Sequence, residues 1–485
     1  MATLPRRQFV QRAVVTVAAL STRHWALADT RQGGEASEQI GTRLDAAAIR
    51  KFGAAITGHL ITTDAPDYES SRLIFNRAFD KRPALIVRCA GPADIAHSLE
   101  FAQRHALAVA VRGGGHNRAG LSVCDGGVVV DLSAMNRVEV DSAGRLARAE
   151  AGALTVHVDA ATQRFGLATT LAGCPTVGIA GLTLGGGEGL LMSKYGLACD
   201  NLTSAQLLTV DGRQVEASAT SNPDLFWAIR GGGGNFGVAW ALEYRLHPVS
   251  DVLAGTLVYP AGEIRQRLEV FAKVVAAAPD EFNVVGVVSA SAQGPRFQML
   301  VGHCGDPRQG TNLLSPLRAL NPQKDTVRTM SYLEANATIN PAAPVAHFQT
   351  DLFVPQLTAA VIETIAAAID SGPPNSRVFM VPIYGAVTRV GPGDTAYPLR
   401  HTGCELDLMG RWDAPSDKDA AVQWVKALRD KLHPFATGAY VNQLGETSDD
   451  LVRTAYGANY SRLVALKKKY DPNNVLHSNQ NIRPG

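Results

Sequence analysis

Residues 111–117 read Val111-Arg112-Gly113-Gly114-Gly115-His116-Asn117, and residues 173–181 read Gly173-Cys174-Pro175-Thr176-Val177-Gly178-Ile179-Ala180-Gly181. The second stretch continues as Leu184-Gly185-Gly186-Gly187-Glu188-Gly189. Successive glycines have no Cβ, so their backbone N–H groups can approach an anion closely. The simplest interpretation is structural: His116 is a turn residue, and Cys174 is a small buried hydrophobic residue.

His116 and Cys174 are also candidate covalent anchors for a flavin. An imidazole can bond the 8α-methyl carbon of the isoalloxazine system, and a thiolate can bond the C6 carbon. Because both positions belong to the same benzenoid ring, a protein that holds both residues at that edge could tether the flavin twice. A glycine run alone is weak evidence for phosphate binding, so both interpretations stay open on these residues alone.

The size and composition of the chain indicate a globular protein of two or three domains. It has 485 residues, of which 46% are hydrophobic and 19% charged, enough for a sizeable core. The net charge is only +2, and no basic run is interleaved with aromatic residues, so we expect no nucleic-acid partner. The short cluster Lys467-Lys468-Lys469 is interpreted as a solvated helix face. The six cysteines show no CxxC pair and no ligand spacing with histidine, so no metal site is predicted.

The N-terminus is typical of a twin-arginine signal peptide. Arg6 and Arg7 precede an aromatic residue, a short apolar run follows, and Ala26-Leu27-Ala28 has the pattern of a cleavage site. Residues 1–28 are therefore predicted to be a signal, with the mature protein in the periplasm or secreted. The apolar run is too short to span a bilayer, and no membrane association is expected. The alternative is a chance arginine pair in a basic tail.

The pattern along the mature chain predicts an α+β protein. Residues 83–131 alternate strand, helix and strand, and the texture changes after His247-Pro248, where β-alternating segments with intervening helices begin. We therefore predict a first domain over 29–246, a second over 247–435 with an antiparallel sheet covered by helices, and a returning segment over 436–485. One helix is predicted from Asp449 to Tyr470, ended by Asp471-Pro472. No strand–GxGxxG–helix unit or Walker A sequence is present.

Further motifs follow the glycine stretches in a fixed order. They are Lys194-Tyr195-Gly196-Leu197-Ala198-Cys199-Asp200-Asn201, the segment Trp227 to Gly237, Tyr456-Gly457-Ala458-Asn459-Tyr460, Lys469 to Asn474, and Asn479-Gln480-Asn481-Ile482. Together these motifs resemble the berberine bridge enzyme-like branch of the FAD-linked oxidases, which have the vanillyl-alcohol-oxidase fold. The resemblance runs from about Pro83 to the end of the chain.

This resemblance implies a two-part FAD-binding domain of the PCMH type with an inserted α+β substrate domain. It also implies a bicovalent FAD, with an 8α-histidyl bond to His116 and a 6-S-cysteinyl bond to Cys174. Val177 matches a position where the family leaves space for oxygen beside the flavin. The other cofactor-binding residues that the resemblance implies are Arg112, Gly113, Gly114, Gly115, Asn117, Gly178, Gly181, Gly185, Gly186, Gly187, Tyr195, Asp200, Asn201, Gly234, Asn235, Phe236, Asn479 and Asn481.

Tyr440, Asn442 and Glu188 are the candidate catalytic residues. In the family the base is often the first tyrosine of a Tyr-x-Asn-Tyr element, which is Tyr440-Val441-Asn442-Gln443 here, with Gln443 departing from the second tyrosine. A tyrosine must be activated, since its free pKa is about 10; alternatively, Tyr440 simply packs at the domain seam. Glu188 stands where many relatives carry an aromatic residue, and it either meets the substrate or points away at a helix start.

The predicted function is that of an FAD-dependent oxidase acting on an alcohol or sugar. Hydride from a C–H bond beside a hydroxyl would pass to flavin N5, and molecular oxygen would reoxidise the flavin to give hydrogen peroxide. The partners are then a small-molecule substrate and oxygen. Two alternatives stay open: an amine or secondary-metabolite oxidase that cyclises or aromatises its substrate, and a flavin-binding protein without turnover.

Overall fold

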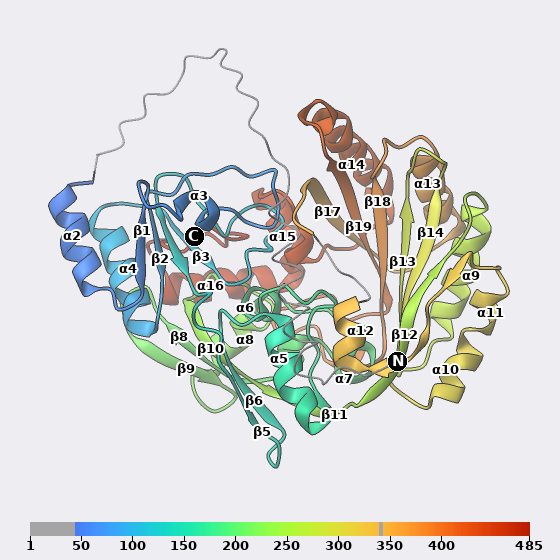
Figure 1. Cartoon of the computed structure of the whole chain (residues 1–485), viewed down its shortest axis with the longest axis horizontal. Helices are drawn as coiled ribbons and strands as arrows, with labels where there is room; N and C mark the ends of the chain where they lie inside the picture. Colours follow the sequence, from blue (N-terminus) through green and yellow to red (C-terminus); the bar gives the residue numbers. More distant parts are fainter. Residues whose placement is uncertain (1–43, 339–342) are drawn as a thin grey trace. The chain divides into compact units, whose positions relative to one another are not determined.

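The structure is a computed structural model that describes residues 44–338 and 343–485. The predicted signal segment over 1–28, with Arg6 and Arg7, lies outside the described residues. Helix α2 (Ala46–Ala55) begins the described chain, and residues from Phe52 to the end form one compact unit. The helices and strands of this unit are labelled in Figure 1.

The first sheet has four strands in the order β1-β2-β4-β3. Strands β2, β4 and β3 are parallel, and β1 is antiparallel to β2. Helix α4 begins at Pro92 after Gly91, and the Asp94 carboxylate accepts hydrogen bonds from the backbone N–H groups of Thr57, Gly58 and Ala90. The elements are β1 (His59–Thr62), α3 (Tyr68–Ser71), β2 (Leu85–Arg88), α4 (Pro92–Arg104), β3 (Val109–Arg112) and β4 (Val128–Asp131). Strand β3 ends at Arg112, and the first glycine stretch begins at the next residue.

The second sheet has five antiparallel strands in the order β5-β6-β10-β8-β9. Its strands are β5 (Val138–Asp141), β6 (Leu146–Glu150), β8 (Leu202–Leu208), β9 (Gln214–Ser218) and β10 (Val238–Arg245). The helices between them are α5 (Thr155–Thr162), α6 (Ile179–Leu184), α7 (Met192–Tyr195) and α8 (Pro223–Ile229). A two-stranded pairing of β7 (Leu167–Ala168) with β11 (His247–Pro248) marks the passage to the third sheet.

The third sheet is antiparallel throughout, in the order β15-β12-β14-β13-β18-β19-β17, with β16 paired to β12. Its strands are β12 (Asp251–Val258), β13 (Phe282–Ser289), β14 (Arg296–His303), β15 (Lys324–Asp325), β16 (Arg328–Ser331), β17 (Ala346–Val354), β18 (Arg377–Ile383) and β19 (Gly403–Trp412). Helices α9 (Ile264–Ala276), α13 (Ala359–Asp370) and α14 (Lys418–Leu432) lie along one face of it (Figure 1), and α10 (Pro307–Leu313), α11 (Ser315–Arg318) and α12 (Tyr332–Thr338) complete this part.

The two faces of the third sheet differ because side chains alternate along each strand. On β19, Cys404, Leu406 and Leu408 join the apolar core under the helices. Glu405 and Asp407 therefore lie on the opposite face, away from α9, α13 and α14. The predicted α+β class, with an antiparallel sheet covered by helices, is confirmed, and the open face of this sheet is available for a site.

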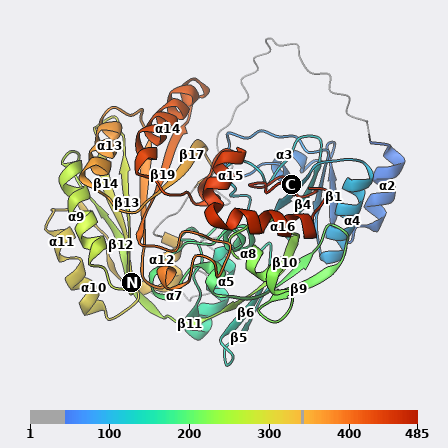
Figure 2. The ribbon, with the colours of Figure 1, turned by 180° about the vertical axis from the view of Figure 1, so that it is seen from behind.

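The C-terminal segment returns beside the elements of the first two sheets (Figure 2). The single helix predicted over residues 449–470 is wrong: α15 (Asp449–Tyr456) and α16 (Tyr460–Tyr470) are separated by a 3-10 turn. Gly457 ends α15 with a φ of +50°, a left-handed conformation that a glycine adopts without strain. The chain changes direction at this turn, although the sequence pattern over residues 449–470 is typical of a single helix.

Lys467 corrects a second expectation about this segment. Its side chain is fully buried, with the ammonium 2.6 Å from Asp471 and donating to the carbonyls of Asn235 and Leu476. Only Lys468 and Lys469 are exposed, so the cluster is not a uniform solvated face. The buried ion pair fastens α16 to the segment that follows β9 and α8, and it ties the end of the chain to the first half.

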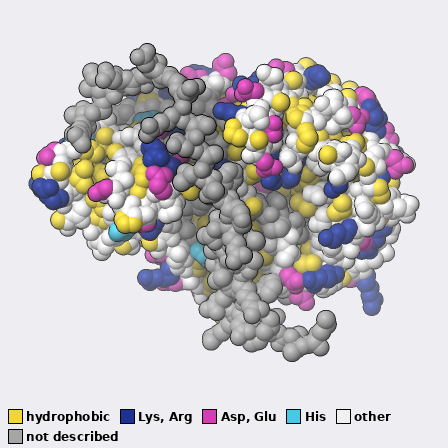
Figure 3. All heavy atoms as spheres, turned by 45° about the horizontal axis from the view of Figure 1, so that its top comes forward, with side chains coloured by type: hydrophobic (Ala, Val, Ile, Leu, Met, Phe, Trp, Pro, Cys, Tyr) yellow, Lys and Arg dark blue, Asp and Glu magenta, His cyan; other side chains and the backbone are white. Residues whose placement is uncertain are grey.

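The described surface carries charges of both signs. On the face shown in Figure 3, Lys and Arg side chains are interspersed with Asp and Glu instead of gathering in one basic area. Within residues 44–338 and 343–485, no helix is both long and apolar enough to cross a membrane.

All six cysteines are free thiols.

Candidate active site

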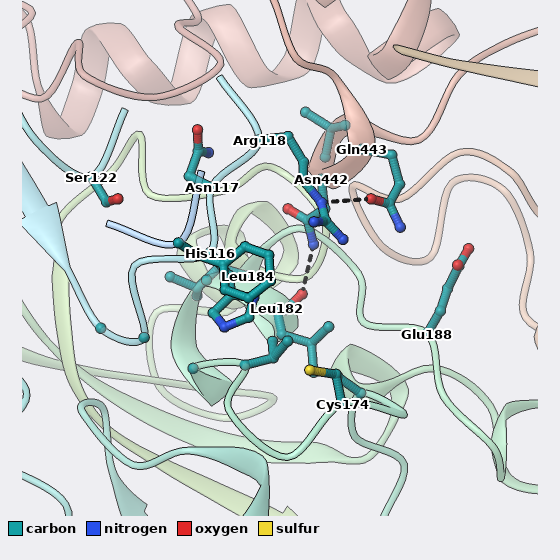
Figure 4. Close-up of a pocket in the computed structure, with 18 of the residues that line it drawn as sticks. His116, Asn117, Arg118, Ser122, Cys174, Leu182, Leu184, Glu188, Asn442 and Gln443 are labelled. Atoms are coloured by element: carbon teal, nitrogen blue, oxygen red, sulfur yellow. Dashed lines mark hydrogen bonds between the residues drawn. The ribbon is translucent and has the colours of Figure 1, made fainter. Parts of the chain in front are cut away.

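A cavity of about 680 Å³ lies between the glycine stretches and the open face of the third sheet. Ligand sites in proteins usually measure about 300–1,000 Å³, so this one is of ample size for a cofactor edge with a small substrate. Its walls come from the segments 113–118, 172–184, 188–190 and 233–239, from β13, β14, β18 and β19, and from residues 440–443 and 476–480. Figure 4 shows part of this lining.

His116 and Cys174 meet in this cavity, as Figure 4 shows. The hydroxyl of Thr176 lies 3.0 Å from His116 Nε2 and 3.5 Å from Cys174 Sγ, so both side chains converge on one oxygen atom. The ring of Phe75 stacks on the imidazole with 4.0 Å between centroids. Burial, together with Arg118 and His347, lowers the pKa of His116 to about 3. The imidazole is therefore neutral at physiological pH and keeps a lone pair for bond formation.

Two glycines explain how the two loops come so close. A Cβ placed on Gly114 would lie 2.3 Å from the backbone nitrogen of Gly178, and one placed on Gly178 would lie 2.2 Å from that of Gly114. Any side chain at either position would push the loops apart, so only glycine fits both. The glycine pair is therefore what brings the histidine loop against the cysteine loop.

The cavity lining fits a flavin dinucleotide. Gly181 and Gly234 face open space, since no atom beyond their chain neighbours and the backbone of the α6 helix lies within 4 Å of a Cβ built on either. Among the described residues, the buried Ser122 Oγ and Asn479 Oδ1 line the cavity without a hydrogen-bond partner. Buried polar atoms in proteins are nearly always paired, so these atoms and the open glycines suit a long polar cofactor.

Twelve of the residues that were predicted to bind the cofactor line the cavity. They are Gly113, Gly114, Gly115, His116, Asn117, Cys174, Val177, Gly178, Gly181, Gly234, Asn235 and Asn479. These residues come from four segments that are far apart in the sequence and that the fold brings to one cavity.

The glycine run 185–187 lies against Tyr440 and Asn442. A Cβ on Gly185 would lie 2.1 Å from Asn442 Oδ1, and the N–H of Gly187 donates to the Tyr440 hydroxyl. Gly186 and Gly187 also have φ values of +132° and +95°. This run therefore makes room for Tyr440 and Asn442 and does not line the cavity itself.

The structure places Arg112, Asp200, Phe236 and Asn481 outside the cavity as well. Arg112 pairs with Asp131 at 2.8 Å, and Asp200 pairs with Arg400 at 2.7 Å. Phe236 is fully buried in the core, and Asn481 lines a separate, smaller cavity. The two ion pairs, of Arg112 with Asp131 and of Asp200 with Arg400, hold their segments in place.

Tyr195 and Asn201 share one partner, also away from the cavity. The Tyr195 ring stacks on His247 with 4.0 Å between centroids, and Asn201 Oδ1 lies 2.7 Å from His247 Nε2. This trio joins the segment after α7 to β11, and so it fastens the two halves of the chain near the start of the third sheet.

Glu188 lies in the irregular segment between α6 and α7 and lines the cavity. The alternative that it points away at a helix start is wrong, because α7 begins only at Met192. Its buried carboxyl group lies beside that of Glu405, which comes from β19. Burial raises the pKa of both groups, which favours their protonated forms.

Asp407 is a further buried carboxyl on the same face of β19, and it lines the cavity. Burial raises its pKa from 3.8 to about 7, although Arg118 lowers it. Its Oδ1 atom has no hydrogen-bond partner among the described residues. Asp407 is therefore close to half ionised at neutral pH, with an oxygen free to accept a proton.

Tyr440 is held by hydrogen bonds and does not merely pack at the domain seam. Its hydroxyl oxygen accepts from the N–H of Gly187 and from Asn442 Nδ2, both at 2.8 Å. These donors favour the phenolate, but burial and the neighbouring Glu188 and Glu405 outweigh them and raise the pKa well above 10. At neutral pH Tyr440 is consequently a phenol whose oxygen is fixed in position.

Sequence reasoning missed Thr176, Glu405, Asp407, Arg118, Arg377 and Arg411. The sequence did contain a signal for three of them. Glu405, Asp407 and Arg411 occupy alternate positions of one strand, so they lie on the same face, and Cys404, Leu406 and Leu408 occupy the other face. No group of three or more His, Cys, Asp or Glu side chains is arranged to hold a metal within the described part of the chain.

Comparison with known proteins agrees with this geometry. Residues 83–218 match the family model for an FAD binding domain, and residues 439–483 match the one for berberine and berberine-like proteins. The (R)-6-hydroxynicotine oxidase of Paenarthrobacter nicotinovorans is 31% identical over 456 residues, which cover 89% of this chain and 97% of that one. Chitooligosaccharide oxidase of Gibberella zeae is 27% identical over 470 residues, which cover 89% and 94%. The crystal structure of 6-hydroxy-D-nicotine oxidase from Arthrobacter nicotinovorans superimposes with a TM-score of 0.82 at 28% identity, covering 89% of this chain and 98% of that one.

The fold and the site define an FAD-dependent oxidoreductase with a PCMH-type FAD-binding domain. More narrowly, the chain belongs to the berberine bridge enzyme-like family of FAD-linked oxidases. The family predicted from the sequence and the FAD cofactor are thereby confirmed.

Proposed function

We propose that this protein is an oxidase of a hydroxyl-bearing substrate, with FAD attached to both His116 and Cys174. When bound, FAD would take the hydride and pass two electrons to oxygen, so that R₂CHOH and O₂ give R₂C=O and H₂O₂. One observation supports this most. Two anchor side chains converge on Thr176 in the same cavity that the buried carboxyl of Asp407 lines from the third sheet.

The two anchors have complementary chemistry in this site. His116 is neutral, so its imidazole can act as a nucleophile without first losing a proton. Cys174 lies beside it, within reach of the same Thr176 hydroxyl. Attachment at the 8α-methyl and C6 positions of one flavin ring requires both side chains at the same edge of the ring, and both lie within 3.5 Å of the Thr176 hydroxyl.

Asp407 is the best-placed acceptor for the proton of the substrate hydroxyl. A general base works best when its pKa is near the working pH, and Asp407 meets this condition while Tyr440 does not. Tyr440, fixed by Gly187 and Asn442, would hold the substrate oxygen by a hydrogen bond. Glu188, whose pKa burial raises to about 7, is the second candidate for the base.

An amine substrate is the second function worth testing. The 31% identical relative is a hydroxynicotine oxidase, and the carboxyls of Glu188 and Asp407 could accept hydrogen bonds from an amine. A peroxide assay over sugars, alcohols and amines separates the two: we expect turnover with hydroxyl compounds and none with amines that lack a hydroxyl. Turnover confined to such amines would overturn the proposal.

Turnover itself is tested by the colour of the purified protein. With a substrate from that panel and no oxygen, the yellow flavin absorbance should bleach, and air should restore it with release of one peroxide per flavin. A protein that keeps its colour with every compound would be a flavin-binding protein without turnover.

The pH dependence of flavin reduction should show the titration of Asp407. Burial raises its pKa to about 7, and a base accepts a proton only when it is deprotonated. The reduction rate should therefore rise about tenfold per pH unit up to about pH 7 and level off above it. Stopped-flow absorbance between pH 5 and 9, roughly two units on either side of that pKa, measures this profile. A flat profile would show that no such carboxyl controls the step.

Export by the twin-arginine route is a separate proposal, carried by Arg6 and Arg7 in the segment outside the described residues. This route carries folded proteins, which suits a cofactor bound covalently in the cytoplasm. Changing both arginines to lysine should keep the precursor in the cytoplasm, as cell fractionation would show, because the receptor recognises the guanidinium pair. Normal export of that variant would contradict the assignment.

A further inference from the structure

The open face of the third sheet carries acidic groups toward one end and basic groups toward the other. Along β19, Glu405 and Asp407 are followed on the same face by Met409 and Arg411. On the neighbouring strand β18, Phe379 is opposite Asp407, and Arg377 is opposite Met409. Asp407, Arg377 and Arg411 all line the cavity, so the charge gradient lies within one binding site.

Three arginines line this cavity, and they differ in their charge partners. Arg118 has the nearby Asp407, whose pKa it lowers, and its Nε donates to Gln443 as Figure 4 shows. Arg411 is 3.2 Å from the exposed Asp413, but its buried Nε has no partner among the described residues. For Arg377, the described part of the chain offers neither an ion pair nor a hydrogen bond.

Among the described residues, Arg377 is consequently a partly buried guanidinium without an anionic partner. Burial lowers its pKa, and the neighbouring Arg411 lowers it further by repulsion. A buried charge is stabilised only by a partner of opposite sign with well-placed hydrogen bonds. The cavity thus has an excess of one positive charge at its basic end, which a singly charged anion would balance.

We propose that the substrate carries a carboxylate bound between Arg377 and Arg411, and a hydroxyl that meets Asp407. This substrate class is a hydroxy acid, such as a sugar acid, and it rests on the proposed oxidation of a hydroxyl compound. Arg377 and Arg411 are then the residues that determine substrate specificity. A neutral sugar would leave the Arg377 charge unbalanced, and a cationic amine would be repelled by both arginines.

The chemistry of guanidinium groups favours a carboxylate as the anion. A carboxylate is planar and accepts two parallel N–H donors, and its single charge matches the single unbalanced guanidinium. The level of Arg377 lies two residues along the strands from that of Asp407, which corresponds to about 7 Å. A carboxylate and a hydroxyl at opposite ends of one sugar ring have a comparable separation.

Binding to the purified holoenzyme tests this proposal without turnover. Isothermal titration calorimetry would compare D-galacturonate with D-galactose, and 4-(hydroxymethyl)benzoate with 4-methylbenzyl alcohol, each pair differing in the carboxylate. We expect at least one carboxylate to bind about 10- to 100-fold more tightly than its neutral partner, as a charge-assisted bidentate contact provides. D-Galactose 6-phosphate, which carries a second charge, should bind more weakly than galacturonate.

Variants locate the contact. Arg377→Gln should abolish the preference for the carboxylate, and Arg377→Lys should retain only part of it, because lysine keeps the charge but loses the planar fork. Arg296→Gln is the matched control: Arg296 is exposed on β14, outside the cavity lining, so its loss should keep the preference.

Each other outcome overturns the inference. Equal affinity within both pairs, or no binding by either carboxylate, would show that the cavity does not select an anion. Tighter binding of the phosphate would assign a different anion, and a preference that survives Arg377→Gln would place the contact elsewhere. Failure of the oxidase proposal has a separate signature, since carboxylate binding would then persist in a protein whose flavin no substrate bleaches.

Discussion

Replacing Asp407 by asparagine should slow flavin reduction about 100- to 10,000-fold, the usual contribution of a general base. Asparagine has nearly the same shape but accepts no proton, so the cavity and the bound flavin should be preserved. Oxygen reacts with the reduced flavin after the substrate has been oxidised, and this second step does not need the carboxylate. Stopped-flow absorbance follows the two half-reactions separately, and only the first should slow.

Tyr440→Phe and Glu188→Gln are the matched comparisons for that result. Tyr440→Phe removes a neutral hydroxyl that holds the substrate oxygen, and a single hydrogen bond corresponds to about a tenfold change in rate. Glu188→Gln leaves Asp407 in place and should also have the smaller effect. If Tyr440→Phe lowers the rate more than Asp407→Asn, the base is the phenol, as the sequence resemblance implies. If Glu188→Gln does so, the base is Glu188.

The double variant His116→Ala with Cys174→Ala should release its flavin completely when it is denatured, whereas each single variant should retain covalent flavin. The reason is that each side chain reaches the same part of the cavity independently, through its own loop and beside the Thr176 hydroxyl. Absorbance of the acid-precipitated pellet measures the retained flavin. Thr176→Val is a suitable control, because it removes the bridging hydroxyl while leaving both anchors.

Release of flavin from one of the single variants would show that the residue left in place does not form a bond. Retention in the double variant would point to a third attachment site. Both outcomes can be read even if the variants are inactive, since the measurement depends only on the bond between flavin and protein.

Local signals in the sequence predicted much of this architecture. Alternation in β13 and β19 indicated strands, and the change after His247-Pro248 anticipated the third sheet, whose first strand begins at Asp251. The glycine motifs also predicted that His116 and Cys174 meet, although these residues are far apart in the chain. The structure brings both residues into one cavity, because Gly114 and Gly178 have no Cβ to keep their two loops apart.

The predictions that failed concern partners that are distant in sequence. Lys467 was predicted to lie on a solvated helix face, and only Asp471 together with carbonyls from other segments makes its burial possible. Nothing in the sequence indicated that the lack of side chains at 185–187 makes room for Tyr440 and Asn442, which lie some 250 positions later. Such long-range packing leaves no periodic trace in the sequence.

The buried carboxyls were missed for a related reason. Glu405 and Asp407 stand in an alternating strand, where polar residues are expected to face solvent. Here the polar face is covered by the first half of the chain, so that burial raises the pKa of both groups. Only the tertiary structure shows that this face is the wall of a cavity.

Peptide mapping of the wild-type protein tests the central claim most directly. Trypsin should release the peptides Gly113–Arg118 and Phe165–Lys194, which contain His116 and Cys174 and no other candidate anchor. Double attachment predicts that mass spectrometry finds these two peptides joined through one flavin. If both peptides are recovered separately and free of flavin, the account of the site is contradicted.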